Sequence, residues 1–163
     1  MAIQVLDKIF AFIIEGFFMA GAGLSILGIR LKFKKMLHIA GIYGIIVYAV
    51  RKFYIINEIP FGTHIFILCV SFALLIKTIG KQNIMVSFIA SLFSILLIFW
   101  GEGVFLFPIL KFFEINPQTL TLKHGGTILA ILISDIILIA VFLMSYIFKV
   151  RIIDLGSFKE TKN

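Results

Sequence analysis

A long apolar run that contains a single carboxylate constrains the fold of this chain most strongly. Residues 84–107 read IMVSFIASLFSILLIFWGEGVFLF, with Glu102 as the charged residue among them. The whole sequence is similar in character: 61% of its 163 residues are hydrophobic, and the mean hydropathy is +1.15. A protein of this size has too much surface to bury so many apolar side chains in a core. We therefore expect lipid to surround most of the chain.

Five apolar segments approach the length of about 20 residues that a transmembrane helix needs. They are residues 9–29, 36–50, 63–79, 84–105 and 127–148. Lipid offers backbone groups no hydrogen-bond partner, so each segment must be helical. The sequence therefore predicts an all-α, polytopic transmembrane bundle with five spans in residues 1–150, followed by a short cytoplasmic tail at 151–163.

Sequence signals at the ends of three of these segments affect where each segment stops or starts. The second segment is short because Arg51 and Lys52 follow it, although it could continue through the apolar residues beyond them. Pro108 is expected to bend or end the fourth, and residues 107–113 to lie at the membrane interface. The first lacks a strongly basic start and an A-x-A-like cleavage site, so we expect it to be retained as a span.

The distribution of basic residues predicts the orientation. Ten of the 15 basic residues fall on one side of a five-span arrangement. These ten are Arg30, Lys32, Lys34, Lys35, Lys77, Lys81, Lys149, Arg151, Lys159 and Lys162. By the positive-inside rule this side is cytoplasmic, so the N-terminus lies outside and the C-terminus inside. The expected location is the bacterial cytoplasmic membrane.

Ionisable residues inside the apolar segments are the candidate functional residues. Glu15 and Asp135 lie about 9 and 12 Å below the expected outer surface, and Glu102 lies about 27 Å above the inner one. Arg51 and His64 border the same level. Intramembrane ionisable groups usually face the bundle interior and form pairs, so we predict an outer polar site for a ligand or a proton. The alternative is that these side chains only form hydrogen bonds between helices.

Small residues that share helical faces are expected to form helix–helix contacts, because they let backbones approach closely. They are Gly16, Ala20 and Gly23 in the first segment, Ser91, Ser94 and Gly101 in the fourth, and Ser134 in the fifth.

Other classes of site are disfavoured. The net charge of +7 does not indicate nucleic acid, because the basic residues are not interleaved with aromatics on one polar face. The three histidines are expected on different sides, so no metal site or cofactor is predicted. His64 and Cys69 are about 140° apart on a helix and do not face each other as a catalytic pair would. We expect a protein that is not an enzyme.

Two short motifs carry a resemblance to known proteins. IPFGTH (residues 59–64) follows the basic-aromatic RKFY (51–54), and GEG occupies 101–103. With the hydropathy pattern, these resemble uncharacterised small multi-pass membrane proteins of anaerobic Firmicutes. Those proteins are in turn similar to the transmembrane sensing portion of GHKL-type, sporulation-kinase-like sensor histidine kinases. The chain has no phosphorylatable-histidine helix or ATP-binding domain, so the resemblance implies a detached sensing or regulatory module.

The sequence leads to one functional hypothesis and two alternatives. The leading hypothesis is a module that relays an extracytoplasmic or in-membrane signal to a histidine kinase, another membrane partner or a second copy of itself. The first alternative is a small ion-coupled transporter or transporter subunit. The second is a cysteine peptidase of the accessory-gene-regulator type, whose histidine follows a double glycine where His64 follows Gly62 and Thr63.

Overall fold

The computed structural model describes residues 2–60, 62–116, 119–120 and 125–148, which contain helices and no β-strand. The helices are α1 (Ala2–Ile26), α2 (Phe33–Ile56), α3 (His64–Thr78), α4 (Ile84–Gly101), α5 (Phe107–Phe112), α7 (Gly126–Ser134) and α8 (Ile136–Phe142), with π-helical segments η1 (Glu102–Leu106) and η2 (Leu143–Ile147). The prediction of an all-α fold is confirmed for these residues. The predicted tail, residues 151–163, lies outside them.

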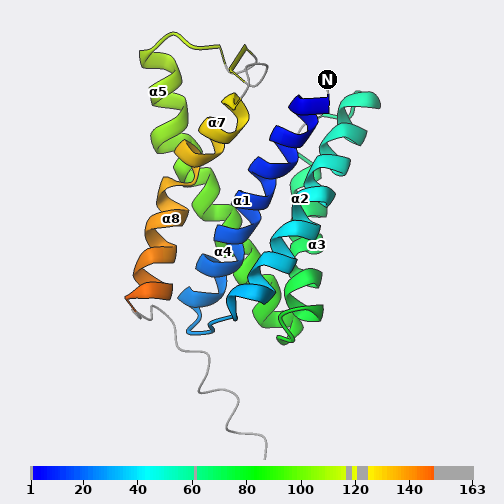
Figure 1. Ribbon diagram of the computed structural model, residues 1–163, viewed down its shortest axis with the longest axis vertical. Helices are drawn as coiled ribbons and strands as arrows, with labels where there is room; N and C mark the ends of the chain where they lie inside the picture. Colours follow the sequence, from blue (N-terminus) through cyan, green and yellow to red (C-terminus); the bar gives the residue numbers. More distant parts are fainter. Residues whose placement is uncertain (1, 61, 117–118, 121–124, 149–163) are drawn as a thin grey trace, which may run out of the picture.

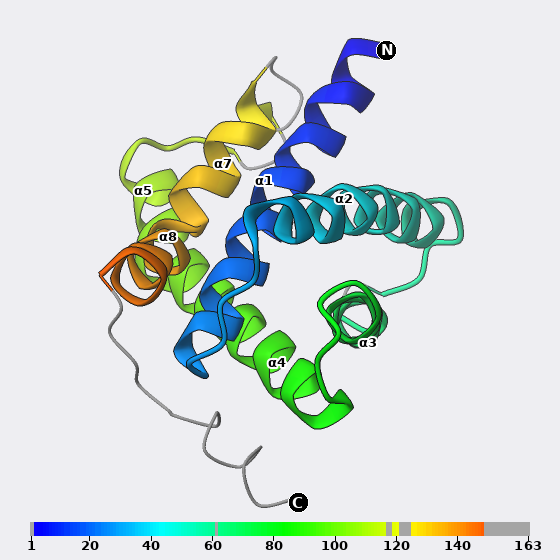
Figure 2. The ribbon, with the colours of Figure 1, turned by 60° about the horizontal axis from the view of Figure 1, so that its bottom comes forward.

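The helices form a bundle in which α1 is central. Helix α1 packs against α2, α4, α7, α8 and η2, whereas α3 packs against α2 and α4. Successive long helices alternate in direction, so the start of α1 and the end of η2 lie at opposite ends of the bundle (Figure 1). A turned view shows α3 end-on beside α2 (Figure 2).

Three helices are long and apolar enough to cross a membrane: Gln4–Ile26, Phe33–Ile56 and the continuous stretch Ile84–Phe112. A bent pair, Gly126–Ser134 and Ile136–Tyr146, passes the same test as one broken span. Helix α3 is apolar but has 15 residues, which is about 22 Å at about 1.5 Å per residue. The structure thus supports three spans, or four with the bent pair, of the five that the sequence predicts.

The second predicted segment was too short. We expected residues 36–50, with a continuation through residues 53–56 as the alternative, and α2 runs from Phe33 to Ile56, so it follows the longer alternative and includes Arg51 and Lys52. Long basic side chains can keep their stems against apolar surface while their charged ends reach polar surroundings, so they need not end a helix. Arg51 therefore lies about a turn and a half before the end of α2.

The fourth segment also continues further than predicted, because the helix does not end at Pro108. It runs on to Phe112 after a π-helical turn in which the Phe107 N–H donates to the Glu102 carbonyl. Proline lacks an N–H and its ring clashes with the carbonyl four residues earlier, but the start of a helical turn tolerates it. Pro108 occupies that position in α5, directly after the wider turn of η1.

The fifth predicted segment is broken at Asp135, a feature that its hydropathy did not indicate. Asp135 has φ −86° and ψ 6°, and α7 and α8 meet there at a bend of 59°. Two contacts fix the lower end of this segment: Arg30 donates to the Ser145 carbonyl at 3.2 Å, and the Tyr146 hydroxyl donates to the Leu31 carbonyl at 3.0 Å.

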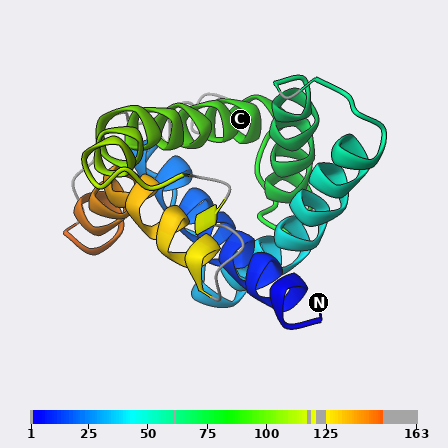
Figure 3. The same ribbon diagram turned by 90° about the horizontal axis from the view of Figure 1, so that it is seen from above.

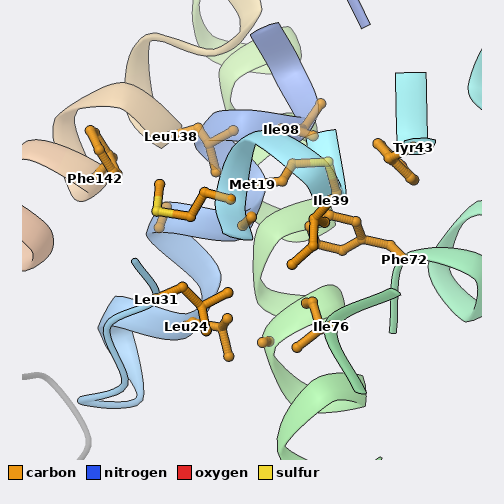
Figure 4. Packing of buried hydrophobic residues seen from close by; sticks show 14 of the residues in the cluster. Met19, Leu24, Leu31, Ile39, Tyr43, Phe72, Ile76, Ile98, Leu138 and Phe142 are labelled. Carbon is orange, nitrogen blue, oxygen red and sulfur yellow. The ribbon is translucent and has the colours of Figure 1, made fainter. Parts of the chain in front are cut away.

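The apolar core follows α1 through the bundle. Met19, Leu24, Phe72, Ile76 and Leu138 are among its buried members (Figure 4). Large apolar side chains also cover the outside: Phe66 is 76% exposed, and Met85 is 72% exposed. Such a surface suits lipid as the surrounding medium.

The small residues singled out in the sequence lie at close helix contacts. A side chain at Gly16 would meet Tyr43 and Ala40 of α2, and one at Gly23 would meet Ser94 and Ala90 of α4. A side chain at Gly101 would overlap the Ser134 carbonyl of α7.

Hydroxyl groups add hydrogen bonds at these contacts. Ser94 donates to the Met19 carbonyl of α1 and Ser91 to the Cys69 carbonyl of α3, each at 2.9 Å. Ser134 donates within its own helix to Ile131, and Ala20 is 1% exposed.

Candidate functional site

A cavity of about 450 Å³ lies between α1, α2, α3 and α4, and we call it the acidic cavity. Its polar lining consists of Glu15 from α1, Tyr43 and Arg51 from α2, His64 from α3 and Glu102 from η1. Its apolar lining is Met19, Ile65, Leu68, Ile95, Ile98, Phe99 and Phe107. Seen from above, the four helices that supply these residues lie around one region of the bundle (Figure 3).

A smaller cavity of about 160 Å³ shares three side chains with the acidic cavity. Glu15, Arg51 and Glu102 border both, and the smaller one adds Thr127 and Ser134 from α7. These three ionisable groups therefore lie where α1, α2 and the α4–η1 helix meet α7.

Glu15 and Arg51 each have a buried polar atom that makes no hydrogen bond. Glu15 is 7% exposed, and its Oε2 makes no hydrogen bond. The Arg51 guanidinium carbon lies 4.6 Å from the centre of the Phe12 ring, while Arg51 Nε is buried without a partner. A cation over an aromatic face gains an electrostatic attraction, but this contact satisfies no N–H. Both groups could therefore accept a further polar partner.

His64 enters the site from the first turn of α3. The Gly62 N–H donates to His64 Nδ1 at 3.2 Å, so the neutral ring carries its hydrogen on Nε2. The Tyr54 ring packs edge-on against His64 at 5.7 Å between centres, and the Thr63 hydroxyl donates to that of Tyr54 at 3.2 Å. These contacts fix the orientation of the imidazole.

Asp135 lies beside this arrangement but does not line either cavity. It is fully buried, and neither carboxylate oxygen has a hydrogen-bond partner. It is close enough to Glu15 and Glu102 to interact with both electrostatically. The structure thus brings Glu15, Glu102, Arg51 and His64 around one cavity and places Asp135 in the layer behind it, at the break between α7 and α8.

Tyr43 is the site residue that the sequence reasoning missed. It is 3% exposed, and its ring packs over Gly16 while lining the acidic cavity. A signal was available, since Tyr43, Val47 and Arg51 recur every four residues and so share one face of α2. A tyrosine hydroxyl adds a neutral donor and acceptor to the charged groups.

The structure does not pair the cysteine with this site. Cys69 is buried, its Sγ lies 3.4 Å from the Ser91 hydroxyl, and it is not among the residues that line the acidic cavity. Among the residues that the structure describes, no group of three or more His, Cys, Asp or Glu side chains could hold a metal ion. His124 lies outside those residues.

The arrangement favours a positively charged or proton-donating guest. Two carboxylates, Glu15 and Glu102, line the acidic cavity with a single guanidinium, so an excess of negative charge remains when all three groups are ionised. Burial of an unpaired charge is costly, which makes a bound cation or proton favourable there.

No protein-family model matches the chain, and no curated protein or solved structure is significantly similar to it.

Proposed function

We propose that the chain is an integral protein of the bacterial cytoplasmic membrane that crosses it five times, with its N-terminus outside and its C-terminus inside. The bent α7–α8 pair counts as one crossing in this proposal. Helix α3 counts as another, because a short span is accommodated by local thinning of the bilayer and by flanking basic residues such as Lys77.

In this membrane the chain acts as a non-enzymatic sensing or regulatory module. The observation that carries this proposal is the acidic cavity, where Glu15, Arg51, His64 and Glu102 from four helices surround about 450 Å³. A protonated ligand that enters it would supply partners to carboxylates that have too few. Binding shifts the packing of the helices only if the ligand binds two states of the bundle with different affinity.

The signal would leave the protein on the opposite side of the membrane. The basic connection at residues 30–35 contacts η2 through Arg30 and Leu31. This connection would meet anionic lipid or a partner, and the resemblance to kinase sensing portions makes a histidine kinase the first partner to test. A second copy of the chain is the other partner to test.

The sole tryptophan offers a direct test. Trp100 is two residues from Glu102 on the same helix and is 68% exposed. We expect its fluorescence, in protein reconstituted into liposomes, to change when a small protonated amine such as methylammonium is added. Glu15→Gln and Glu102→Gln should abolish the change, whereas Glu58→Gln, at an exposed carboxylate outside the cavity, should keep it.

The same liposomes separate sensing from transport. A sensor should show the fluorescence change without uptake of labelled methylammonium. An unchanged signal in the wild type, or equal signals in all three variants, would contradict the proposal.

A specific observation favours a second candidate, a small ion-coupled transporter. Transporter sites are often built on broken helices near the membrane midplane. The 59° break between α7 and α8 carries Asp135, a fully buried carboxylate. A transporter would accumulate the labelled amine, and Asp135→Asn would stop this uptake while the protein stays folded.

A further inference from the structure

A third cavity, of about 440 Å³, lies between α1, α2 and α7, and we call it the basic cavity. Its lining combines three cationic side chains, Lys8, Arg51 and Lys52, with Phe12, Tyr48, Ile55, Ile56 and Thr127. No acidic side chain is among these lining residues, all of which the structure describes. The charge of this cavity is therefore opposite to that of the acidic cavity.

The three cations come from helix ends that lie on the same side of the bundle. Lys8 is in the second turn of α1, and Arg51 and Lys52 are in the last two turns of α2 (Figure 1). In the proposed membrane this is the level of the lipid head groups. Basic side chains at that level attract anionic lipid phosphates.

Apart from the hydroxyl groups of Tyr48 and Thr127, the rest of the lining is apolar, which a phosphate ion alone would not need. Phe12 is buried, and Ile55 and Ile56 are 63% and 67% exposed on the outer face of α2. An acyl chain that follows these side chains stays in contact with apolar surface as it leaves the cavity. The basic cavity therefore has a charged part and an apolar part, as an amphiphile does.

We propose that the basic cavity binds one anionic phospholipid. Its phosphate would lie among Lys8, Arg51 and Lys52, and the first part of its acyl chains would lie along Phe12 and Ile55. Arg51 Nε, which is buried without a partner, supplies an N–H for this phosphate. A guanidinium is well suited to phosphate because its planar donors match two oxygens at once.

Arg51 connects this lipid site to the acidic cavity, because it lines both. A phosphate that binds Arg51 competes with the electrostatic attraction of Glu15 and Glu102 for the same guanidinium. Lipid composition would then alter how strongly the acidic cavity holds a cation. This inference rests on the membrane placement proposed above and not on the sensing role.

The test compares lipids by native mass spectrometry of the full chain in detergent. We expect phosphatidylglycerol to bind more tightly than phosphatidylcholine at one site. In the double variant Lys8→Gln/Lys52→Gln this preference should fall by about 30-fold, at about fivefold for each basic side chain near a lipid phosphate. The charge-conserving variant Lys8→Arg/Lys52→Arg should keep it, which shows that substitution at these positions leaves the fold intact.

A matched control has the same loss of charge at the other end of the bundle. Lys77→Gln/Lys81→Gln removes two exposed lysines at the end of α3 far from the basic cavity and should leave the preference unchanged. Equal binding of both lipids, an equal loss in the two glutamine variants, or inorganic phosphate that displaces the lipid at equal concentration would overturn the inference. If the lipid preference holds while Trp100 shows no response to methylammonium, the sensing proposal fails and the lipid site stands.

Discussion

Asp135 lies in surroundings that are unfavourable to an ionised carboxylate. It has no exposed surface, and neither of its carboxylate oxygens has a hydrogen-bond partner. A buried polar group without a partner costs about 1–3 kcal/mol, and more when it is charged. Intramembrane acids of this kind are usually retained for function, because they do not contribute to stability.

The first prediction is that Asp135→Asn leaves the protein at least as stable as the wild type. We expect a gain of up to about 3 kcal/mol, because the substitution removes a desolvated carboxylate and no hydrogen bond. Thermal unfolding in detergent measures this. The contrasting variant is Asp7→Ala, because Asp7 Oδ2 accepts from the Gly125 N–H at 3.2 Å and the loss of that bond should destabilise. If Asp135→Asn were the more destabilising of the two, the carboxylate would have a structural role.

The second prediction concerns the two glycines beside Glu102. Gly101→Ala should destabilise by about 1–3 kcal/mol, because its methyl group would overlap the Ser134 carbonyl and push α4 away from α7. Gly103→Ala has nothing within 4 Å and should be neutral or stabilise by up to about 1 kcal/mol through helix propensity. The same unfolding assay compares the pair. Equal effects at both positions would mean that the Gly101 contact does not limit the approach of the helices.

Helix α4 packs against both α1 and α3 and forms hydrogen bonds to each of them. Its serines reach carbonyl groups of two neighbours, Met19 on α1 and Cys69 on α3. Its continuation into η1 presents Glu102 at the first π-helical turn, and π-helical turns often occur at functional sites.

The third prediction separates contacts between helices from those within one. Ser91→Ala should cost about 0.5–1.5 kcal/mol, because it removes a hydrogen bond to another helix. Ser94→Ala should cost a similar amount, because its hydroxyl lies 2.9 Å from the Met19 carbonyl of α1 as well as from the Ala90 carbonyl of its own helix. Ser87→Ala should cost less, since Ser87 is as deeply buried but donates to Asn83 of its own first turn. Unfolding by sodium dodecyl sulfate measures the three variants. A loss at Ser87 as large as at Ser94 would show that burial, and not bonding between helices, sets the cost.

The whole molecule has an apolar outside and a polar interior at one end. The acidic and basic cavities both lie toward the end where α1 starts and α2 finishes, and Arg51 belongs to both. The proposed orientation places this end outside the cell. The proposed orientation determines which molecules can reach the two cavities, because cavities on that side are accessible to extracytoplasmic molecules.

The fourth prediction tests the orientation. In a Cys69→Ala background, Asn57→Cys should react with a membrane-impermeant maleimide on intact cells, whereas Lys32→Cys should react only after the cells are broken. Both positions are exposed and lie at opposite ends of α2, so their chemical reactivity is comparable. The reverse pattern would place the N-terminus in the cytoplasm and the polar end with it.

The helical fold could be predicted from the sequence. In lipid, the backbone N–H and C=O groups of a long apolar segment find hydrogen-bond partners within a helix. The sequence also directed attention to Glu15, Glu102, Arg51 and His64, which line one cavity in the structure. It left the end of α2 open between Val50 and Ile56, since hydropathy falls where basic side chains begin even when the helix continues.

The break at Asp135 and the basic cavity depend on tertiary packing, so the sequence did not predict them. The break at Asp135 has no proline or glycine to mark it, and it occurs where the Ser134 carbonyl faces Gly101. The basic cavity arises because residues 43 positions apart, Lys8 and Arg51, are brought together by the antiparallel packing of α1 on α2.

The central position of α1 has a consequence for biogenesis. Helix α1 is synthesised before α7 and α8, which cover part of its surface. During that interval Glu15 already has Tyr43, Arg51 and Glu102 near it, but the side of α1 that α7 and α8 cover is open. In the proposed membrane this side of α1 therefore faces acyl chains until the bent pair of α7 and α8 is inserted and packs against it.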